Sequence, residues 1–217
     1  MNRPLRLATS ALAVSAALLL SSCGSSDDGS KDSDKIAGAE NGGEEKSPSP
    51  SAPDSEAVER PKVDLPADLT YTFDWPKTGK KADDAILADS EQSIKAVDMA
   101  IAEQDPANKA YRFYYEGEAA AQTQKFIQAY VDAKARTTGA YRYYNPEVSG
   151  DGGSASLVYC EDQSKAYDKY LKKDKVKKTP ATKNSYVLYA AKLQKNDAGV
   201  WVTTQINSTR GSAKCQP

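Results

Sequence analysis

Residues 186–207 read YVLYAAKLQKNDAGVWVTTQIN, and this stretch predicts the fold more directly than any other. Tyr186–Lys195 and Val200–Asn207 both show the period-two alternation and the aromatic and β-branched content of strands. Asn196–Gly199 between them has the Asn, Asp and Gly residues that favour a tight hairpin loop. In the second strand one face is predicted to carry Val200, Val202, Thr204 and Ile206. The chain therefore ends in an antiparallel hairpin with one face available for packing.

Shorter strand patterns precede this hairpin. Ala140–Asn145 is aromatic and strand-like and is predicted to end before Pro146, and Ser156–Glu161 forms the next strand. Tyr71–Trp75 alternates briefly before a proline, as a short edge strand does. Ala166–Lys178 is ambiguous between a short helix and an irregular strand. The sequence thus predicts a sheet of at least four antiparallel strands.

Two longer helical patterns lie between the first strand and the others. Asp83–Glu103 has apolar residues at helical spacing, acidic residues in its first turn and a proline after its end. Glu116–Thr138 is the second helix, with Gly139 as its expected C-terminal cap. Ala110–Tyr115 between them reads as a turn with a short helical piece. This order predicts an α+β fold in which two main helices pack in the concave face of a curved antiparallel sheet.

This order of elements resembles that of NTF2-like lipoproteins, which are secreted proteins of actinobacteria. The landmarks are Asp105-Pro106 after the first long helix, Ala155–Asp162 around a cysteine, and the last Gly-Val-Trp-Val strand leading to Cys215. The resemblance covers roughly residues 65–217. It implies the cone of the nuclear-transport-factor-2 fold, related to the cystatin fold, with a pocket at the open end. It implies no single activity, because one fold hosts many functions.

The first 23 residues have the features of a secretory signal. Arg3 and Arg6 precede the uncharged apolar run Leu7–Leu20, which is too short for a membrane span of ~20 residues. Small serines and Cys23 follow at once, and this junction resembles a bacterial lipobox. The resemblance implies that residues 1–22 are a lipoprotein signal peptide and that Cys23 takes a diacylglycerol group. An ordinary cleaved signal with an incidental cysteine is the alternative.

The next segment is poor in large apolar residues. Gly24–Arg60 consists mainly of Ser, Gly, Asp, Glu and Pro, so it cannot bury enough surface to offset its ordering entropy. The predicted organisation is a signal peptide over 1–22, a lipidated disordered linker over 23–60 and one domain over 61–217. The linker would tether the domain to the extracytoplasmic face of a cell membrane.

The remaining cysteines, Cys160 and Cys215, are an even pair in an oxidising compartment. A disulfide between them would close a loop of roughly 56 residues, for which chain entropy predicts about 4 kcal/mol of stabilisation. A free thiol or a metal site is the alternative, although the absence of histidine argues against zinc. The family resemblance also implies the Cys160–Cys215 bond. No metal or cofactor is predicted.

Charge and histidine content exclude several function classes. Residues 61–217 hold 23 Lys and Arg against 20 Asp and Glu, which is not the basic excess of a nucleic-acid-binding domain. The chain has no histidine, the side chain that most often carries protons in catalysis. An enzyme would need a buried Asp or Glu with a raised pKa, or a Tyr, and no catalytic residue is predicted. A buried carboxylate hydrogen-bonded to Tyr at the base of the cone would be the structural sign of one.

All thirteen tyrosines lie at or after Tyr71. They favour either core packing, which aromatic stripes usually serve, or a tyrosine-lined pocket, because Tyr joins a rigid apolar body to a polar tip. The residues predicted to line such a pocket, from helix and inner-strand faces, are Tyr130, Tyr143, Tyr159, Tyr189 and Trp201.

These features predict a membrane-anchored, non-catalytic lipoprotein that binds a small apolar ligand or an envelope protein. The alternatives are a structural adaptor of an envelope complex and a divergent enzyme. The lysine-rich segment Lys169–Lys183 is either a solvated loop or a contact for anionic lipid or cell-wall polymers. Dimerisation through the outer face of the sheet is a further alternative, although no exposed apolar stripe requires it.

Overall fold

The structure is a computed structural model that describes residues 58–217. The predicted signal peptide over 1–22, the lipidated Cys23 and the linker as far as residue 57 lie outside the described residues. Among the helices of the described part, none is both long and apolar enough to cross a membrane.

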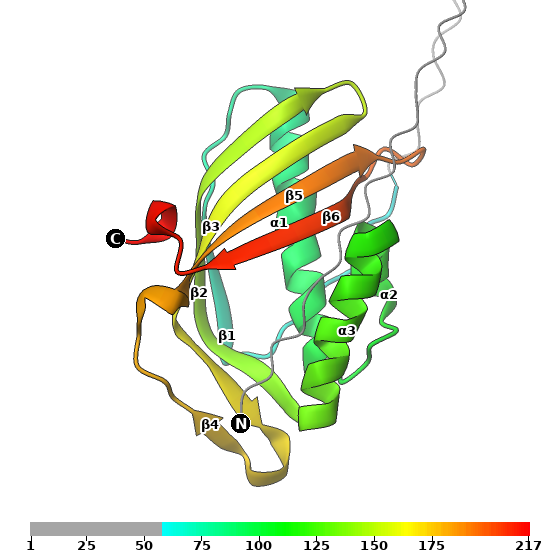
Figure 1. The fold of residues 1–217 in the computed structure, drawn as a ribbon. Coiled ribbons are helices and arrows are strands. Elements are labelled where there is room, and N and C mark those ends of the chain that lie inside the picture. The colour runs from blue at the N-terminus through cyan, green and yellow to red at the C-terminus, as the bar shows by residue number, and fades with distance from the viewer. Residues whose placement is uncertain (1–57) are drawn as a thin grey trace, which may run out of the picture. The chain divides into compact units, whose positions relative to one another are not determined.

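The described residues form a curved mixed sheet of six strands with three helices on its concave side (Figure 1). The sheet order is β1-β2-β3-β5-β6, and β4 pairs with β3 beside this path. β1 runs parallel to β2, whereas all other pairs are antiparallel, as expected. The strands are β1 (Leu69–Asp74), β2 (Ala135–Asp151), β3 (Ser154–Tyr170), β4 (Lys175–Lys177), β5 (Tyr186–Lys195) and β6 (Trp201–Arg210).

β2 and β3 are much longer than the sequence indicates. β2 does not end before Pro146 but continues through it, because a register shift between Tyr144 and Glu147 lets the proline sit at a bulge. Asn145 there has a φ of 51°, a left-handed conformation that Asn tolerates. β3 extends into the ambiguous segment as far as Tyr170, and β4 follows after a short 3-10 turn. Bulges bend a strand, so they contribute to the curvature of the sheet.

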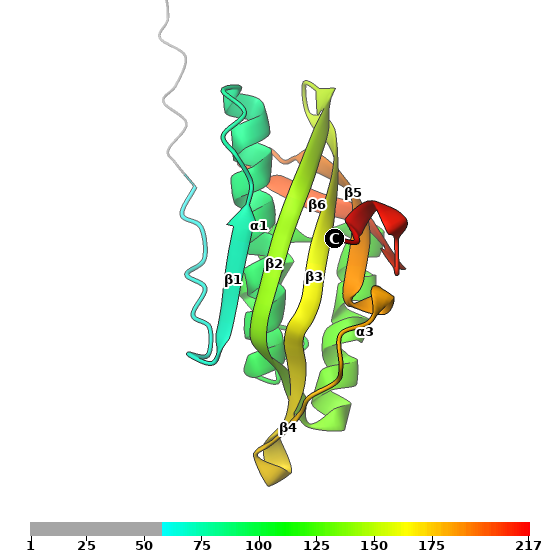
Figure 2. The same cartoon turned by 90° about the vertical axis from the view of Figure 1, so that its left-hand side faces the viewer.

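The helices are α1 (Lys81–Ala102), α2 (Lys109–Tyr114) and α3 (Gly117–Ala133). In α1, Ile86 and Ile101 of the apolar stripe predicted from the spacing are buried, and Ile94 and Val97 are half-buried. Its N-terminal turn is held by Asp84, whose carboxylate accepts hydrogen bonds from the backbone and hydroxyl of Thr78 at 2.7 and 2.9 Å. Turned by 90°, α1 and α3 both lie behind the sheet (Figure 2).

The second long helix ends five residues earlier than predicted. α3 stops at Ala133, and Lys134, not Gly139, takes the left-handed cap conformation with a φ of 48°. Gly139 lies inside β2, where a Cβ atom would be 2.2 Å from the carbonyl oxygen of Lys165 on β3. This glycine is therefore required by a close approach between strands, not by the end of a helix.

The apolar core has two parts along the axis of α1. One part joins the C-terminal half of α1 to α2, α3 and the start of β6, with Ile101, Tyr114 and Ile127 fully buried. The other packs Ile86 and Leu87 of α1 against the inner face of the sheet. Tyrosines belong to both parts, so the core-packing interpretation of the aromatic clusters holds for much of the set.

The segment before β1 packs onto the domain. Val58 contacts the first core part, and the Arg60 guanidinium forms two hydrogen bonds to the Asp89 carboxylate at 2.7 and 3.2 Å. Asp89 is 1% exposed and also accepts the backbone N–H of Trp201 at 2.9 Å. The packed chain therefore already includes Val58, three residues before the boundary at residue 61 that the sequence indicates.

A disulfide joins Cys160 in β3 to Cys215 in the C-terminal 3-10 turn Ala213–Cys215, with the Cα atoms 5.4 Å apart. Both sulfurs belong to buried residues. The Tyr144 hydroxyl donates to the carbonyl oxygen of Cys215. The bond and this contact fix the end of the chain to the convex face of the sheet, where the C-terminus is seen in Figure 1.

Candidate functional site

A cavity of about 430 Å³ lies between α1, α3 and the concave face of the sheet. Its volume is within the range of ~300–1,000 Å³ that is usual for small-molecule sites. Every long strand of the sheet from β2 to β6 contributes to it, and the helices supply Val97, Asp98 and Phe126 among others.

Tyrosine rings form much of the cavity wall. Successive strands place them on one face, so that Tyr141 and Tyr143 of β2 stand beside Tyr159 of β3 and Tyr189 of β5. Tyr159 and Tyr189 are cross-strand partners with stacked rings 5.1 Å apart. The rings that line the cavity are Tyr115, Tyr130, Tyr141, Tyr143, Tyr159 and Tyr189.

Asp98 of α1 is buried in this wall and is held by two hydroxyls. The Thr137 hydroxyl donates to one carboxylate oxygen at 2.7 Å, and the Tyr71 hydroxyl donates to the other. Burial raises the pKa of the Asp98 carboxyl above its ordinary value, although these two hydrogen bonds act in the opposite direction. Burial, followed by the charge of Asp98, also raises the pKa of Tyr71.

Glu161 of β3 is a second buried carboxyl group, 4% exposed. It accepts the Tyr143 hydroxyl at 2.9 Å and the Gln163 amide at 2.6 Å. Gln163 in turn accepts a hydrogen bond from Arg210 at 2.9 Å. Burial is the main reason that the pKa of Glu161 is raised, and the charge of Asp98 raises it further. The cavity thus combines aromatic walls with two buried carboxyl groups whose pKa values are raised.

Tyr159 brings a further polar atom into the cavity. The residue is 4% exposed and lines the cavity, and burial raises the pKa of its hydroxyl well above the ordinary value. A polar group of a bound molecule that reaches this hydroxyl can form a hydrogen bond with it.

Of the five residues predicted from the sequence to line a pocket, four line this cavity and one does not. Tyr130, Tyr143, Tyr159 and Tyr189 line the same cavity. Trp201 does not line it. This residue opens β6, where it packs with the second core part and its backbone N–H contacts Asp89.

The two buried carboxyl groups were missed by sequence reasoning, although a signal exists for each. Asp98 lies four residues after Ile94 and three before Ile101, so helical spacing places it on the apolar face of α1. Glu161 continues the Leu157 and Tyr159 face of its strand. An acidic residue on an otherwise apolar face is the pattern that marks them.

We predict that these carboxyl groups make stability fall as pH rises. An acid whose folded pKa is raised contributes stability that is complete below its unfolded pKa, about 4, and lost as pH rises through the folded value. The double variant Asp98→Asn/Glu161→Gln should therefore gain melting temperature relative to the wild type between pH 4 and pH 8, measured by calorimetry. A difference that stays constant over this range would contradict the prediction.

Asp68 provides a control of opposite sign. Its hydrogen bond with Arg136 lowers the pKa of Asp68 to about 2. Its stabilising contribution is fully present above its unfolded pKa and is lost as pH falls through the folded pKa of about 2. Asp68→Asn should therefore lose melting temperature relative to the wild type above pH 4, and this loss should shrink as the pH approaches 2.

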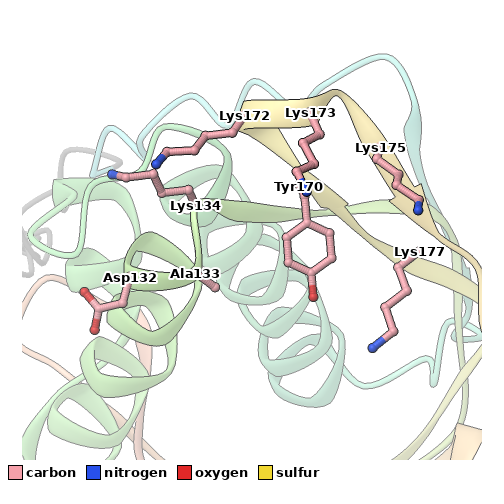
Figure 3. Close-up of a pocket in the computed structure, with 8 residues that line it drawn as sticks. All are labelled: Asp132, Ala133, Lys134, Tyr170, Lys172, Lys173, Lys175 and Lys177. Atoms are coloured by element: carbon pink, nitrogen blue, oxygen red, sulfur yellow. The ribbon is translucent and has the colours of Figure 1, made fainter.

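A second hollow of about 610 Å³ lies at the end of the sheet that carries β4 (Figure 3). It is lined by Asp132, Ala133, Tyr170 and the lysines Lys134, Lys172, Lys173, Lys175 and Lys177. Lys169 is directed elsewhere, to Asp174 at 2.9 Å and Asp68 at 3.6 Å. The predicted contact of Lys169–Lys183 with anionic lipid or polymer stays a prediction, and this hollow is the surface that would make it.

Comparisons with solved structures report similarity of fold. The chain is similar to a ketosteroid isomerase-like protein from Erwinia carotovora atroseptica, with 14% identity over 61% of this chain and 98% of that one and a TM-score of 0.44. It is similar to an NTF2-like superfamily protein from Salmonella enterica, with 8% identity over 59% and 92% and a TM-score of 0.42. The intermembrane space region of the chloroplast protein ARC6 is a third, with 14% identity over 62% and 99% and a TM-score of 0.38.

No protein-family model and no curated protein sequence matches the chain. The similarities to solved structures are too distant to carry an activity, so fold assignment depends on the chain's own architecture. That architecture has the helices on the concave side of a curved sheet, a hollow at the open end and the order of elements that the resemblance implies. Residues 58–217 therefore have an NTF2-like fold.

Proposed function

We propose that this domain binds a small organic molecule in the tyrosine-lined cavity. The observation that carries the proposal is the cavity itself, which six tyrosine rings and two buried carboxyl groups line. At ~30 Å³ per water molecule, 430 Å³ corresponds to roughly fourteen waters, which suits a ligand of similar heavy-atom count. The rings favour a ligand with a compact apolar body, and the two carboxyl groups and the Tyr159 hydroxyl favour one with a polar group.

The proposal includes the location predicted from the sequence. Lipidation of Cys23 would hold the domain at the extracytoplasmic face of a cell membrane, with the segment up to Val58 as the connection. Intact-mass measurement of protein purified from its native host checks this part. A mature protein without an acyl group on Cys23 would remove the anchor from the proposal and leave the ligand site untouched.

Thermal-shift screening of the full chain, purified in mild detergent, tests ligand binding. We expect ring compounds of about this size to raise the melting temperature, because a ligand that binds only the folded state stabilises it. Val97→Trp should abolish the shift by filling the cavity, and Tyr159→Phe should weaken affinity about three- to tenfold through one lost hydrogen bond. Lys172→Ala, in the other hollow, is the matched control and should leave the shift unchanged.

The outcome that contradicts the proposal is equally specific. If no compound shifts the melting temperature of the wild type, or if Val97→Trp folds and responds like the wild type, the cavity is not a ligand site. Tyr159→Phe keeps the proposal testable if Val97→Trp does not fold, because it removes only a hydroxyl.

One observation favours a second function, a proton-transfer enzyme. Asp98 is a carboxyl group buried in the cavity wall and hydrogen-bonded to Tyr71, which is the sign expected of an enzyme without histidine. Its raised pKa brings it nearer to the pH at which general acids and bases work best. Ligands from the screen can be incubated with protein in D₂O and analysed by NMR. Deuterium incorporation by the wild type but not by Asp98→Asn would favour this function, and no incorporation would exclude it for those ligands.

A further inference from the structure

Three buried carboxyl groups lie in this domain, and the fold treats them differently. Asp89 has a counter-ion from the chain itself, the Arg60 guanidinium, at 2.7 and 3.2 Å. Asp98 and Glu161 have none, because within residues 58–217 no Lys or Arg nitrogen comes within ion-pair distance of either carboxylate. The two carboxyl groups without a counter-ion are the two that line the cavity.

Neutral donors alone hold these two carboxyl groups. Asp98 accepts from Tyr71 and Thr137, and Glu161 accepts from Tyr143 and the Gln163 amide. Such donors satisfy the hydrogen bonds of a carboxylate, but they carry no positive charge to offset the free-energy cost of burying its negative charge. The missing positive charge must come either from protons on the carboxyl groups or from whatever enters the cavity.

The rest of the wall suits an organic cation better than a bare ion. Six tyrosine rings line the cavity, and aromatic rings attract alkylated ammonium groups through their π faces. The space of about 430 Å³ is far larger than a dehydrated metal ion needs. In the described part of the chain, no group of three or more metal-ligating side chains is present.

We propose that the cavity selects small organic ammonium ions, with the positive charge held between the Asp98 and Glu161 carboxylates and the tyrosine rings. This inference rests on the proposed function and names the ligand class for the same site. On binding, the cation replaces the protons as the neutralising charge, so both carboxyl groups become more acidic. Cation uptake is therefore coupled to proton release when the empty cavity holds protonated carboxyl groups.

Arg210, at the cavity mouth, is the one cationic side chain in the described lining. It is exposed, and its guanidinium donates to Gln163 at 2.9 Å and to the Asn184 carbonyl oxygen at 3.3 Å. The Gln163 amide accepts from Arg210 through its oxygen and donates to Glu161 through its nitrogen. Arg210 therefore orients the Gln163 amide, and within residues 58–217 it forms no ion pair with Glu161.

Three probes of matched shape separate charge from size. Choline is the cation, 3,3-dimethylbutan-1-ol is its uncharged isostere, and 3,3-dimethylbutanoate carries the opposite charge. NMR titration of the full chain at constant ionic strength, with KCl as the salt control, should give at least tenfold tighter binding of choline than of the alcohol. The carboxylate should bind more weakly still, because two acidic groups repel it.

The variants Asp98→Asn and Glu161→Gln test the assignment to these residues. Each should weaken choline binding at least tenfold and leave the affinity for the alcohol within about twofold, which also shows that the cavity is intact. Calorimetry in two buffers of different ionisation enthalpy should detect proton release on choline binding by the wild type. Lowering the pH to 4 should weaken choline binding and leave alcohol binding unchanged.

Failure of this inference can be told from failure of the proposed function. Equal or tighter binding of the alcohol or the carboxylate overturns the cation preference and keeps the cavity as a ligand site. Binding by none of the three probes, or binding of choline that KCl suppresses as effectively as excess choline, also overturns the preference. The proposed function is contradicted only if, in addition, no ring compound in the wider thermal-shift screen raises the melting temperature.

Discussion

The Cys160→Ala/Cys215→Ala variant is expected to lose about 4 kcal/mol of unfolding free energy, because the cross-link no longer restricts the unfolded chain. The bond spans 55 residues and encloses most of β3 together with β4, β5 and β6, so it restricts more than half of the sheet. For a domain of this size the loss corresponds to a drop of roughly 10 °C in melting temperature. Calorimetry of the variant and of wild type treated with a reducing phosphine measures it.

Two comparisons keep this expectation specific. Reduced wild type should approach the double variant, because both lack the cross-link although only one has altered side chains. A Cys23→Ala variant should melt like the wild type, since Cys23 takes no part in the bond. Reduced protein that melts within 3 °C of the oxidised form would contradict the assigned contribution of the cross-link.

Arg60→Ala should destabilise the domain by about 2–3 kcal/mol, because it leaves the Asp89 carboxylate buried without a counter-ion. Loss of one partner from a buried ion pair costs ~3–5 kcal/mol, and the lower value applies here because Arg60 is 42% exposed and water can reach its position. Urea unfolding measures the change. Lys62→Ala is the matched control, since its ion pair with Asp64 is exposed and should contribute less than about 0.5 kcal/mol.

A double variant separates the lost charge pair from the lost packing. Arg60→Ala/Asp89→Asn should recover at least about 1 kcal/mol relative to Arg60→Ala, because an amide needs no counter-ion yet can still accept the Trp201 N–H. An Arg60→Ala variant as stable as Lys62→Ala would show that the pair contributes nothing beyond a surface contact.

Local sequence patterns predicted the elements whose ends are set by local chemistry. β5, the turn after it and α1 follow period and turn residues closely, whereas β6 runs three residues further than predicted, to Arg210. The predicted end of the second long helix was wrong. The local pattern could not show that Gly139 is needed opposite Lys165, or that Lys134 would adopt the left-handed conformation that ends α3. These are contacts between segments far apart in the chain, and periodicity does not report them.

The sequence predicted which face of the sheet the cavity residues share, but not how far along the strands the cavity lies. Alternation predicts that Tyr143, Tyr159 and Tyr189 share the inner face of the sheet, and in the structure they line one cavity with Tyr130 of α3. It could not show that Trp201 lies at the packed end of β6, whereas the cavity is lined by residues nearer the other end of that strand. The position of a residue along the cone depends on how the helices cross the sheet, which no local pattern encodes.

The contact between Arg60 and Asp89 has a mechanical consequence for any domain suspended from its N-terminal side. A pull on the chain ahead of Val58 does not reach the edge strand β1 first, because Arg60 is fastened to α1 through Asp89. Load passes instead into the longest helix and, through the Trp201 N–H, into the start of β6. Traction from a surface would thus be shared between two central elements before the strand at the rim could peel away.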